Sequence, residues 1–310
     1  MKITYADANR GYLYYTDLYK SLCKLANVKV ITGPQNSKSF RIDKLDRSSD
    51  ALIFGLGWMS QSDPNIYGKM LGLRQLKMPV VCLLHKPQNL LKHKLRFCKT
   101  NHINLLVYSQ KEYKRYGKIA GVPAMQSWMA GDQMIYKDRG IPKIYDFGFS
   151  GALHGGNKIK GRTRNLRSRI QALVKARPGL KLFWNGSDSV APRIKSVKAY
   201  ARRINQCKIW LTTTGPLEDI SPRYFEIGLS KTLIFCNRMG VEHYNNVFRD
   251  GENCVMFKND LSDFNSKLTH YLNRDAERQA IIDTAYNEFI SAHTWDCRAA
   301  ELIGRIQSAR

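Results

Sequence analysis

The sequence predicts an α/β protein built from two Rossmann-like, parallel-sheet domains that face each other across a cleft. Its 310 residues exceed what one hydrophobic core usually accommodates, so two domains of ordinary size are expected. Short apolar, β-branched segments alternate along the chain with segments that repeat apolar residues at helical spacing. Such alternation is typical of βα units, whose strands form parallel sheets.

The elements fall into two series that meet at a polar stretch, residues 133–143, which contains glycine and proline. The stretch places the first domain at residues 1–140 and the second at 141–292. A C-terminal helix is expected over 293–310, and its return to the first domain is left open. Strands are expected at residues 2–7, 28–33, 51–58, 79–86, 104–110, 145–151, 180–186, 208–214, 232–237 and 252–258. Helices are expected at residues 15–26, 111–121, 162–176, 194–205, around Glu226 and through 261–307.

Charge is distributed unevenly along the chain. The 50 lysines and arginines outnumber the 25 aspartates and glutamates, which gives a net charge of +25. Residues 201–310 contain 14 of each sign, so the whole excess lies in residues 1–200. This asymmetry favours a polyanionic partner, such as DNA, an anionic membrane surface or an anionic glycan, over a merely soluble basic protein. The segment 86–99 interleaves lysines with apolar residues, and it fits either a surface for lipid headgroups or phosphates or a solvated helix face.

The cysteines and the hydropathy of the chain indicate the cellular compartment in which the protein is expected. The seven cysteines are widely spaced and form no CxxC pair, which argues against a disulfide framework or a zinc site. No apolar run approaches the length of a membrane span, and no signal-peptide core is apparent at the N-terminus. A cytoplasmic protein is therefore expected. A peripheral position at a membrane, or the host cytoplasm if the protein is viral, is left open.

A glycine-rich, basic turn follows the strand predicted at 145–151. Ligands of open α/β domains bind beyond the carboxyl ends of strands, which is where Gly151 and this turn lie. Cationic side chains and backbone N–H groups before a helix suit a phosphate group. The turn is neither a Walker loop nor GxGxxG, and a flexible basic loop explains it equally well. Its cations are Lys158, Lys160, Arg162 and Arg164.

The segment PLEDISPRYFEIGLSK follows the strand predicted at 208–214. Arg223 and Glu226 stand three positions apart and share one face of the predicted helix. A carboxylate can accept both hydroxyls of a ribose, and an arginine can fork onto a diphosphate. The alternative is an ordinary i,i+3 ion pair on a helix surface, worth a few tenths of a kcal/mol.

Residues 216–298 resemble the C-terminal half of GT-B glycosyltransferases of the group 1 superfamily. The resemblance is carried by RYFEIGLSKTLIF, by FRDGENCVMFKNDLSDFNSKLTHYLNRDAERQAII and by HTWDCRA. Glu218 and Glu226 also have the spacing of the E-x7-E motif of this family. YDFGFSGALHGG is similar to the strand and glycine turn that open its nucleotide domain. The basic turn lacks the Arg-x4-Lys spacing of the family.

The resemblance implies a role for each candidate residue. Glu226 would hold the ribose of a nucleotide sugar, while Arg223, Gly151 and the basic turn would hold its diphosphate. Glu218 would approach the donor sugar, and His85, which ends the strand VVCLLH, would lie near the reacting sugar. A lone histidine in such a place fits a structural role equally well. No bound cofactor is expected, because the UDP-, GDP- or ADP-sugar is a co-substrate.

The expected activity is therefore transfer of a sugar from a nucleotide diphosphate to a hydroxyl, with a glycan or lipid-linked saccharide as acceptor. No DxD-type carboxylate pair lies where a metal is expected, so the sequence predicts metal independence. One alternative is a DNA-modifying glycosyltransferase that acts on a hydroxylated base, because phage enzymes of this kind are similarly basic GT-B proteins with an R-x-x-E helix. Another is a non-catalytic nucleic-acid-binding protein on the same scaffold.

Overall fold

The computed structural model describes residues 1–7, 16–32, 45, 47–154, 165–187, 194 and 196–308. The chain forms two compact units. Unit 1 comprises Met1–Trp128 and Trp295–Arg310, and unit 2 comprises Met129–Thr294. Residues 129–140, which the sequence assigns to the first domain, thus belong to unit 2, and the C-terminal helix belongs to unit 1.

Unit 1 contains a six-stranded parallel sheet with the strand order β2-β1-β3-β4-β5-β6. Strands β3, β4 and β5 are buried along their whole length, which explains why each reads as an unbroken apolar run. β6, half-buried at the edge of the sheet, escaped prediction. The strands are β1 (Lys2–Asp7), β2 (Asn27–Thr32), β3 (Ala51–Phe54), β4 (Val80–Leu83), β5 (Leu105–Tyr108) and β6 (Ala124–Gln126).

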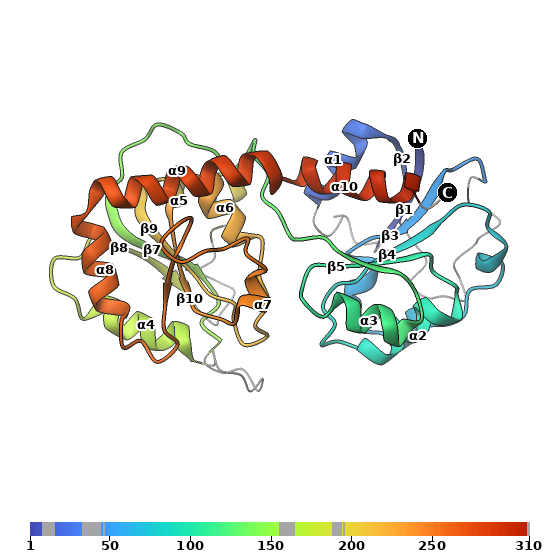
Figure 1. Ribbon diagram of the computed structural model, residues 1–310, viewed down its shortest axis with the longest axis horizontal. Helices are drawn as coiled ribbons and strands as arrows, with labels where there is room; N and C mark the ends of the chain where they lie inside the picture. The colour runs from blue at the N-terminus through green and yellow to red at the C-terminus, as the bar shows by residue number, and fades with distance from the viewer. Residues whose placement is uncertain are drawn as a thin grey trace. The chain divides into compact units, whose positions relative to one another are not determined.

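Helices cover both faces of this sheet. Figure 1 shows α1 and α10 on one face and α2 and α3 on the other. The C-terminal helix α10 contacts α1, and Lys24 bonds to Asp296 at 2.8 Å between them. Ring packing fills the opposite face, where Phe54 meets Trp58 and Phe97 at 5.3 Å between centroids. These helices are α1 (Thr16–Leu25), α2 (Leu91–Thr100), α3 (Tyr113–Ala120) and α10 (Trp295–Ser308).

Lys94 on α2 is a fully buried cation, although the sequence suggested a solvent-facing or ligand-binding stretch over residues 86–99. Its side chain is 0% exposed, and its Nζ donates hydrogen bonds to the carbonyls of His85 (2.8 Å) and Lys86 (2.9 Å). Lys86 has a positive φ of 45°, which is costly for a residue with a side chain. Lys94 therefore stabilises the strained turn that follows β4, and it is not part of a surface.

Unit 2 contains a five-stranded parallel sheet with the order β11-β10-β9-β7-β8. The chain moves from β7 outward to β8 and then returns to β9 on the other side of β7. This reversal is a topological switch point, where α/β domains usually bind ligands. The strands are β7 (Tyr145–Gly151), β8 (Leu182–Gly186), β9 (Cys207–Thr212), β10 (Leu233–Asn237) and β11 (Val255–Phe257). The helices are α4 (Leu166–Lys175), α5 (Val197–Asn205), α6 (Arg223–Leu229), α7 (Val241–Tyr244), α8 (Phe264–Asn273) and α9 (Asp275–Ala292).

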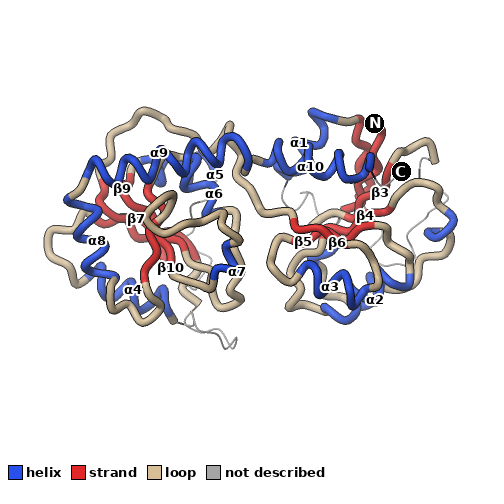
Figure 2. The backbone as a smooth tube through the Cα atoms, in the orientation of Figure 1, coloured by secondary structure: helices blue, strands red, loops and turns tan. Residues whose placement is uncertain are grey.

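Most predicted elements are confirmed, with shifted ends. The continuous helical tail is instead three helices, α8, α9 and α10, separated by short breaks. Figure 2 shows the strands of each unit gathered between layers of helix, so the predicted α/β class with two parallel sheets is confirmed. No helix among the described residues combines the length and apolar character needed to cross a lipid bilayer.

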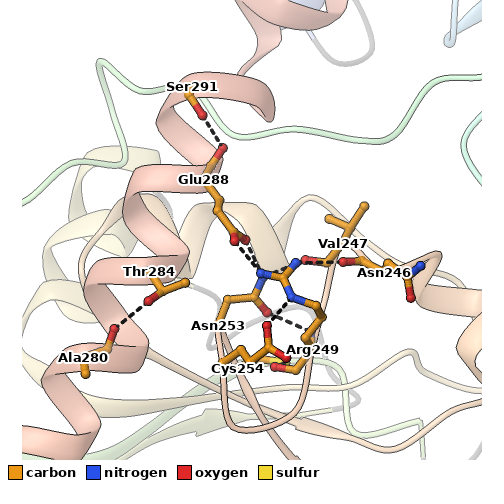
Figure 3. A network of polar contacts seen from close by, with 10 residues as sticks. Asn246, Val247, Arg249, Asn253, Cys254, Ala280, Thr284, Glu288 and Ser291 are labelled. Carbon is orange, nitrogen blue, oxygen red and sulfur yellow. Dashed lines mark hydrogen bonds and ion pairs between the residues drawn. The ribbon is translucent and has the colours of Figure 1, made fainter.

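A buried polar network joins the turn before β11 to α9. Figure 3 shows Glu288 of α9 pointing toward both Arg249 and Asn253. Asn253 is 0% exposed, and its Nδ2 donates to Glu288 (2.7 Å) and to the carbonyl of Val247 (2.8 Å). Its Oδ1 accepts the backbone N–H of Arg249 at 2.8 Å. The RDGEN motif of the sequence is therefore a structural clip between a turn and the long helix of unit 2.

Replacement of Asn253 by alanine should lower the free energy of unfolding by about 2–3 kcal/mol, because three hydrogen bonds are lost at a buried position. Urea denaturation measures this change. Glu252→Ala is the matched control, because Glu252 is exposed and pairs with Arg249 at the surface, a contact worth about 0–1 kcal/mol. Equal losses in the two variants would contradict the role of Asn253 as the centre of the clip.

Candidate nucleotide-sugar site

The predicted site residues of the second domain lie around the switch point between β7 and β9. Gly151 is the last residue of β7, and the turn Thr213–Gly215 directly follows β9. Arg223 and Glu226 lie on α6, the helix that follows this turn. The four cations of the basic turn, Lys158, Lys160, Arg162 and Arg164, lie outside the described residues.

Arg223 packs its guanidinium directly against Gly151. A Cβ atom on Gly151 would lie 2.4 Å from Nη1 of Arg223, a distance that no real side chain shows. Gly151 also has a φ of +150°, a conformation that residues with side chains rarely adopt. The backbone conformation therefore favours glycine here, and the end of the Arg223 side chain occupies the space that a Cβ would take. Structure thus brings together two candidates that are 72 positions apart in the sequence.

Arg167, on the first turn of α4, is a second cation at the switch point, and the sequence prediction missed it. Its side chain is only 7% exposed. Its Nε donates to Oγ1 of Thr213 at 2.8 Å, and its Nη1 donates to the carbonyl of Ala152 at 2.8 Å. The guanidinium thus joins the ends of β7 and β9. Burial and the nearby charge of Arg223 lower the pKa of Arg167 to about 9, so it remains charged at neutral pH.

The signal for Arg167 was present in the sequence. Arg162 and Arg167 have an Arg-x4-Arg spacing, in which arginine stands where the group 1 pattern has lysine. Sequence could not show that the side chain is buried between two strand ends, because that depends on contacts with Ala152 and Thr213.

The side chain of Arg223 makes no hydrogen bond or ion pair with any other part of the chain that the structure describes. In particular, it does not pair with Glu226 on the same helix, so the interpretation of an ordinary i,i+3 surface pair does not describe this helix. Two guanidinium groups that repel each other create a positive potential at the strand ends. Such a place suits an anion.

Glu226 is half-buried in the same neighbourhood. Gly131 packs against the backbone of α6, because a Cβ there would lie 3.4 Å from the nitrogen of Glu226. The hydroxyl of Tyr200 is buried nearby, and burial raises the pKa of this phenol. The charge of Arg223 lowers the pKa of Tyr200, and the charge of Glu226 raises it. Arg223 and Glu226 therefore act on one common region of the site.

Glu218 occupies the turn that follows β9. Its backbone is left-handed, with a φ of 59°, and its N–H donates to the carbonyl of Gly215 at 3.1 Å. The Oε2 atom lies 3.6 Å from Nε2 of His243, a residue of α7 that the sequence prediction did not single out. His243 is 6% exposed, and its Nδ1 lies 3.3 Å from Glu242. The imidazole of His243 thus lies between two carboxylates.

His85 lies in unit 1, just beyond the carboxyl end of β4. Its backbone carbonyl is held by Lys94. Burial, with the charges of Lys86 and Lys94, lowers the pKa of the imidazole from 6.5 to about 3. His85 is therefore neutral at physiological pH. No group of three or more histidine, cysteine, aspartate or glutamate side chains within the described ranges is arranged to hold a metal ion.

Comparisons with known proteins concern the fold. Residues 162–304 match the family described as glycosyl transferase-like. HepE from Anabaena in complex with UDP is similar in structure, with a TM-score of 0.64, 14% identity and coverage of 99% of this chain and 100% of that chain. HepE in complex with UDP-glucose has a TM-score of 0.63, 14% identity and the same coverage.

Other solved structures share the fold at lower identity. Sucrose-phosphate synthase from Thermosynechococcus elongatus has a TM-score of 0.62 and 10% identity, with all of both chains covered. A glycosyltransferase from Rickettsia africae has a TM-score of 0.60 and 9% identity, over 99% of this chain and 98% of that chain. A search of curated proteins by sequence finds no match. The predicted fold is confirmed: this chain has the two-domain fold of GT-B glycosyltransferase structures, and its residues 162–304 match a glycosyl transferase-like family.

Proposed function

We propose that the protein transfers a sugar from a nucleotide diphosphate donor to a hydroxyl of a glycan or a lipid-linked saccharide, without a metal ion. The observation that carries this proposal is the pair of guanidinium groups at the switch point of unit 2. Arg167 is fixed to both strand ends, whereas the Arg223 side chain has no partner among the described residues and lies against a glycine that leaves space beside it. An anionic diphosphate at the strand ends would offset their mutual repulsion.

The remaining residues of the site fit the other parts of such a donor. Glu226, on the same helix as Arg223, would accept the hydroxyls of the ribose. Glu218 would approach the donor sugar from the turn after β9, oriented by its contact with His243. The fold also occurs in HepE, which was solved with UDP and with UDP-glucose, and this favours a uridine nucleotide among the UDP-, GDP- and ADP-sugars.

These residues would promote the reaction mainly by electrostatic stabilisation. As the bond between sugar and diphosphate breaks, negative charge develops on the departing phosphate oxygen. Preorganised guanidinium groups stabilise that charge without having to reorganise, which is the task a metal ion performs in other enzymes. With a pKa of about 3, His85 is too weak a base to remove the proton of an acceptor hydroxyl outright at neutral pH.

Calorimetric titration with UDP-glucose, GDP-glucose and ADP-glucose tests the proposal, together with an assay for release of the nucleoside diphosphate. We expect UDP-glucose to bind and the other two to bind more weakly. Binding of none of the three, by a protein shown to be folded, would remove the proposal.

Glu226→Ala should raise the dissociation constant for UDP-glucose about tenfold, because a charge-assisted hydrogen bond to the ribose is lost. Glu226→Gln should lose less affinity for UDP-glucose, since the amide oxygen of glutamine can still accept a hydrogen bond from the ribose. The thermal midpoint without ligand separates this role from a structural one. A marked loss of stability in the absence of nucleotide would assign Glu226 to the fold instead.

A further inference from the structure

Helices α2 and α3 of unit 1 together present a concentrated basic surface. On α2 the exposed cations recur at positions i, i+4 and i+7, which places them on one side of the helix. On α3 they also lie opposite the buried positions. We define the α2–α3 basic face by these six exposed residues: Lys92, Arg96, Lys99, Lys114, Arg115 and Lys118.

The two helices form one surface. They contact each other, and both figures show them on the same side of the sheet of unit 1. Their inner sides are anchored in one hydrophobic core, through Leu95 and Cys98 of α2 and through Tyr116 and Ala120 of α3. The cations therefore point away from the core on both helices, and their positions are fixed by packing beneath them.

Carboxylates of the described residues do not neutralise these six charges. None of them forms an ion pair in the described part of the chain, and Lys114 meets only the ring of Tyr113, at 5.8 Å. In unit 2, by contrast, several basic residues form ion pairs. Arg238, Arg249 and Lys267 each pair with a carboxylate. Six like charges on two adjacent helices repel one another. Binding to a polyanionic surface would relieve this repulsion, which favours association.

The apolar content of the face distinguishes between polyanions. Ile119 is 52% exposed and stands next to Lys118 on the outer side of α3. An exposed isoleucine among cations suits a bilayer, where it enters the region below the headgroups while the cations meet lipid phosphates. No aromatic ring on either helix is exposed, so the face lacks the stacking platforms that single-stranded nucleic acid requires.

We propose that the α2–α3 basic face docks the protein on an anionic lipid bilayer. The inference does not depend on the donor site, because the face lies wholly in unit 1. Each lysine or arginine near an anionic membrane surface contributes about a fivefold increase in partitioning at physiological salt. Six such residues, with Ile119, suffice for a reversible peripheral association without any spanning helix.

Vesicle flotation of the full chain tests the proposal, with phosphatidylcholine vesicles that contain or lack phosphatidylglycerol. We expect binding only to the anionic vesicles. The triple variant Lys92→Gln, Arg96→Gln, Lys99→Gln should lower this binding at least about tenfold, and the equivalent variant of Lys114, Arg115 and Lys118 should do the same. Ile119→Ser should weaken it about threefold, most clearly at high salt, where electrostatic attraction is screened.

The matched control removes three exposed cations from unit 2, by Lys137→Gln, Lys198→Gln and Arg202→Gln, and should leave vesicle binding within about twofold. An equal loss in this control would overturn the proposal, because net charge rather than the face would then govern binding. Failure of the wild-type chain to float with anionic vesicles would overturn it too. Salt-dependent binding of duplex DNA through these six residues, without any binding to vesicles, would also overturn the proposal. UDP-glucose affinity, measured on the same variants, reports separately on the proposed transferase site.

Discussion

Arg223→Ala is expected to weaken UDP-glucose binding by about 10- to 100-fold, because a bidentate, charge-assisted contact with the diphosphate is worth about 1.5–3 kcal/mol. The same change should alter the free energy of unfolding by less than about 0.5 kcal/mol, since Arg223 bonds to nothing else in the described chain. Few residues offer such a separation of binding from stability. Calorimetric titration and urea denaturation of one preparation measure both quantities.

Two further variants sharpen this experiment. Arg223→Lys keeps the charge but loses the planar fork, so its affinity should fall between those of the wild type and the alanine variant. Arg202→Ala removes an exposed arginine of α5 in the same unit and should leave the affinity unchanged. An unchanged dissociation constant in Arg223→Ala would show that Arg223 does not hold the donor, however close it lies to Gly151.

Lys94→Met is expected to destabilise the protein by about 3 kcal/mol, although it replaces a charged residue by an apolar one of similar length. The carbonyl of His85 loses its charged donor, and that of Lys86 loses the same donor while it keeps the N–H of Asn89. Lys92→Met, two positions earlier on the exposed side of α2, is the matched control and should change stability by less than about 0.5 kcal/mol. Similar effects of the two substitutions would contradict the role of Lys94 as an internal donor.

The pH dependence of Lys94 gives an independent check. Burial and the charge of Lys86 lower its pKa from 10.5 to about 8 in the folded protein. Between these values the unfolded chain binds more protons than the folded one, so this residue makes stability rise as pH increases from 8 to 10.5. The increment should be roughly 2–3 kcal/mol, and it should be absent from the stability curve of Lys94→Met, so that it appears in the difference between the two proteins. A parallel pH dependence in both proteins would contradict a lowered pKa at Lys94.

The prediction and the structure agree best where the signal is local. β3, β4 and β5 are buried runs of four apolar residues, and strands of that kind are recognisable without knowledge of their neighbours. The helix that bears Arg223 and Glu226 was also predicted from its own residues. The three single-turn helices between Trp58 and Gln75 were not, because such short turns have too few residues to show a period.

The candidate site was only partly accessible to prediction. Arg223, Glu226 and Gly151 were identified from motifs, but Arg167 and His243 were not, since each depends on a contact between distant segments. The opposite error occurred at Lys94. Its place in a run of lysines made it look like its exposed neighbours, whereas helical geometry turns it toward the core.

The sequence by itself determined the α/β class, the presence of two parallel sheets and the kind of ligand to expect, because apolar periodicity and strand-end motifs are properties of contiguous residues. Tertiary structure alone decided which cations are available. It buries Lys94 beneath a turn, ties Arg167 to two strand ends and leaves the Arg223 side chain without a partner in the part of the chain that the structure describes. The physical reason is that the burial and pairing of a charge depend on residues far away in the chain, and these meet only when the sheets form.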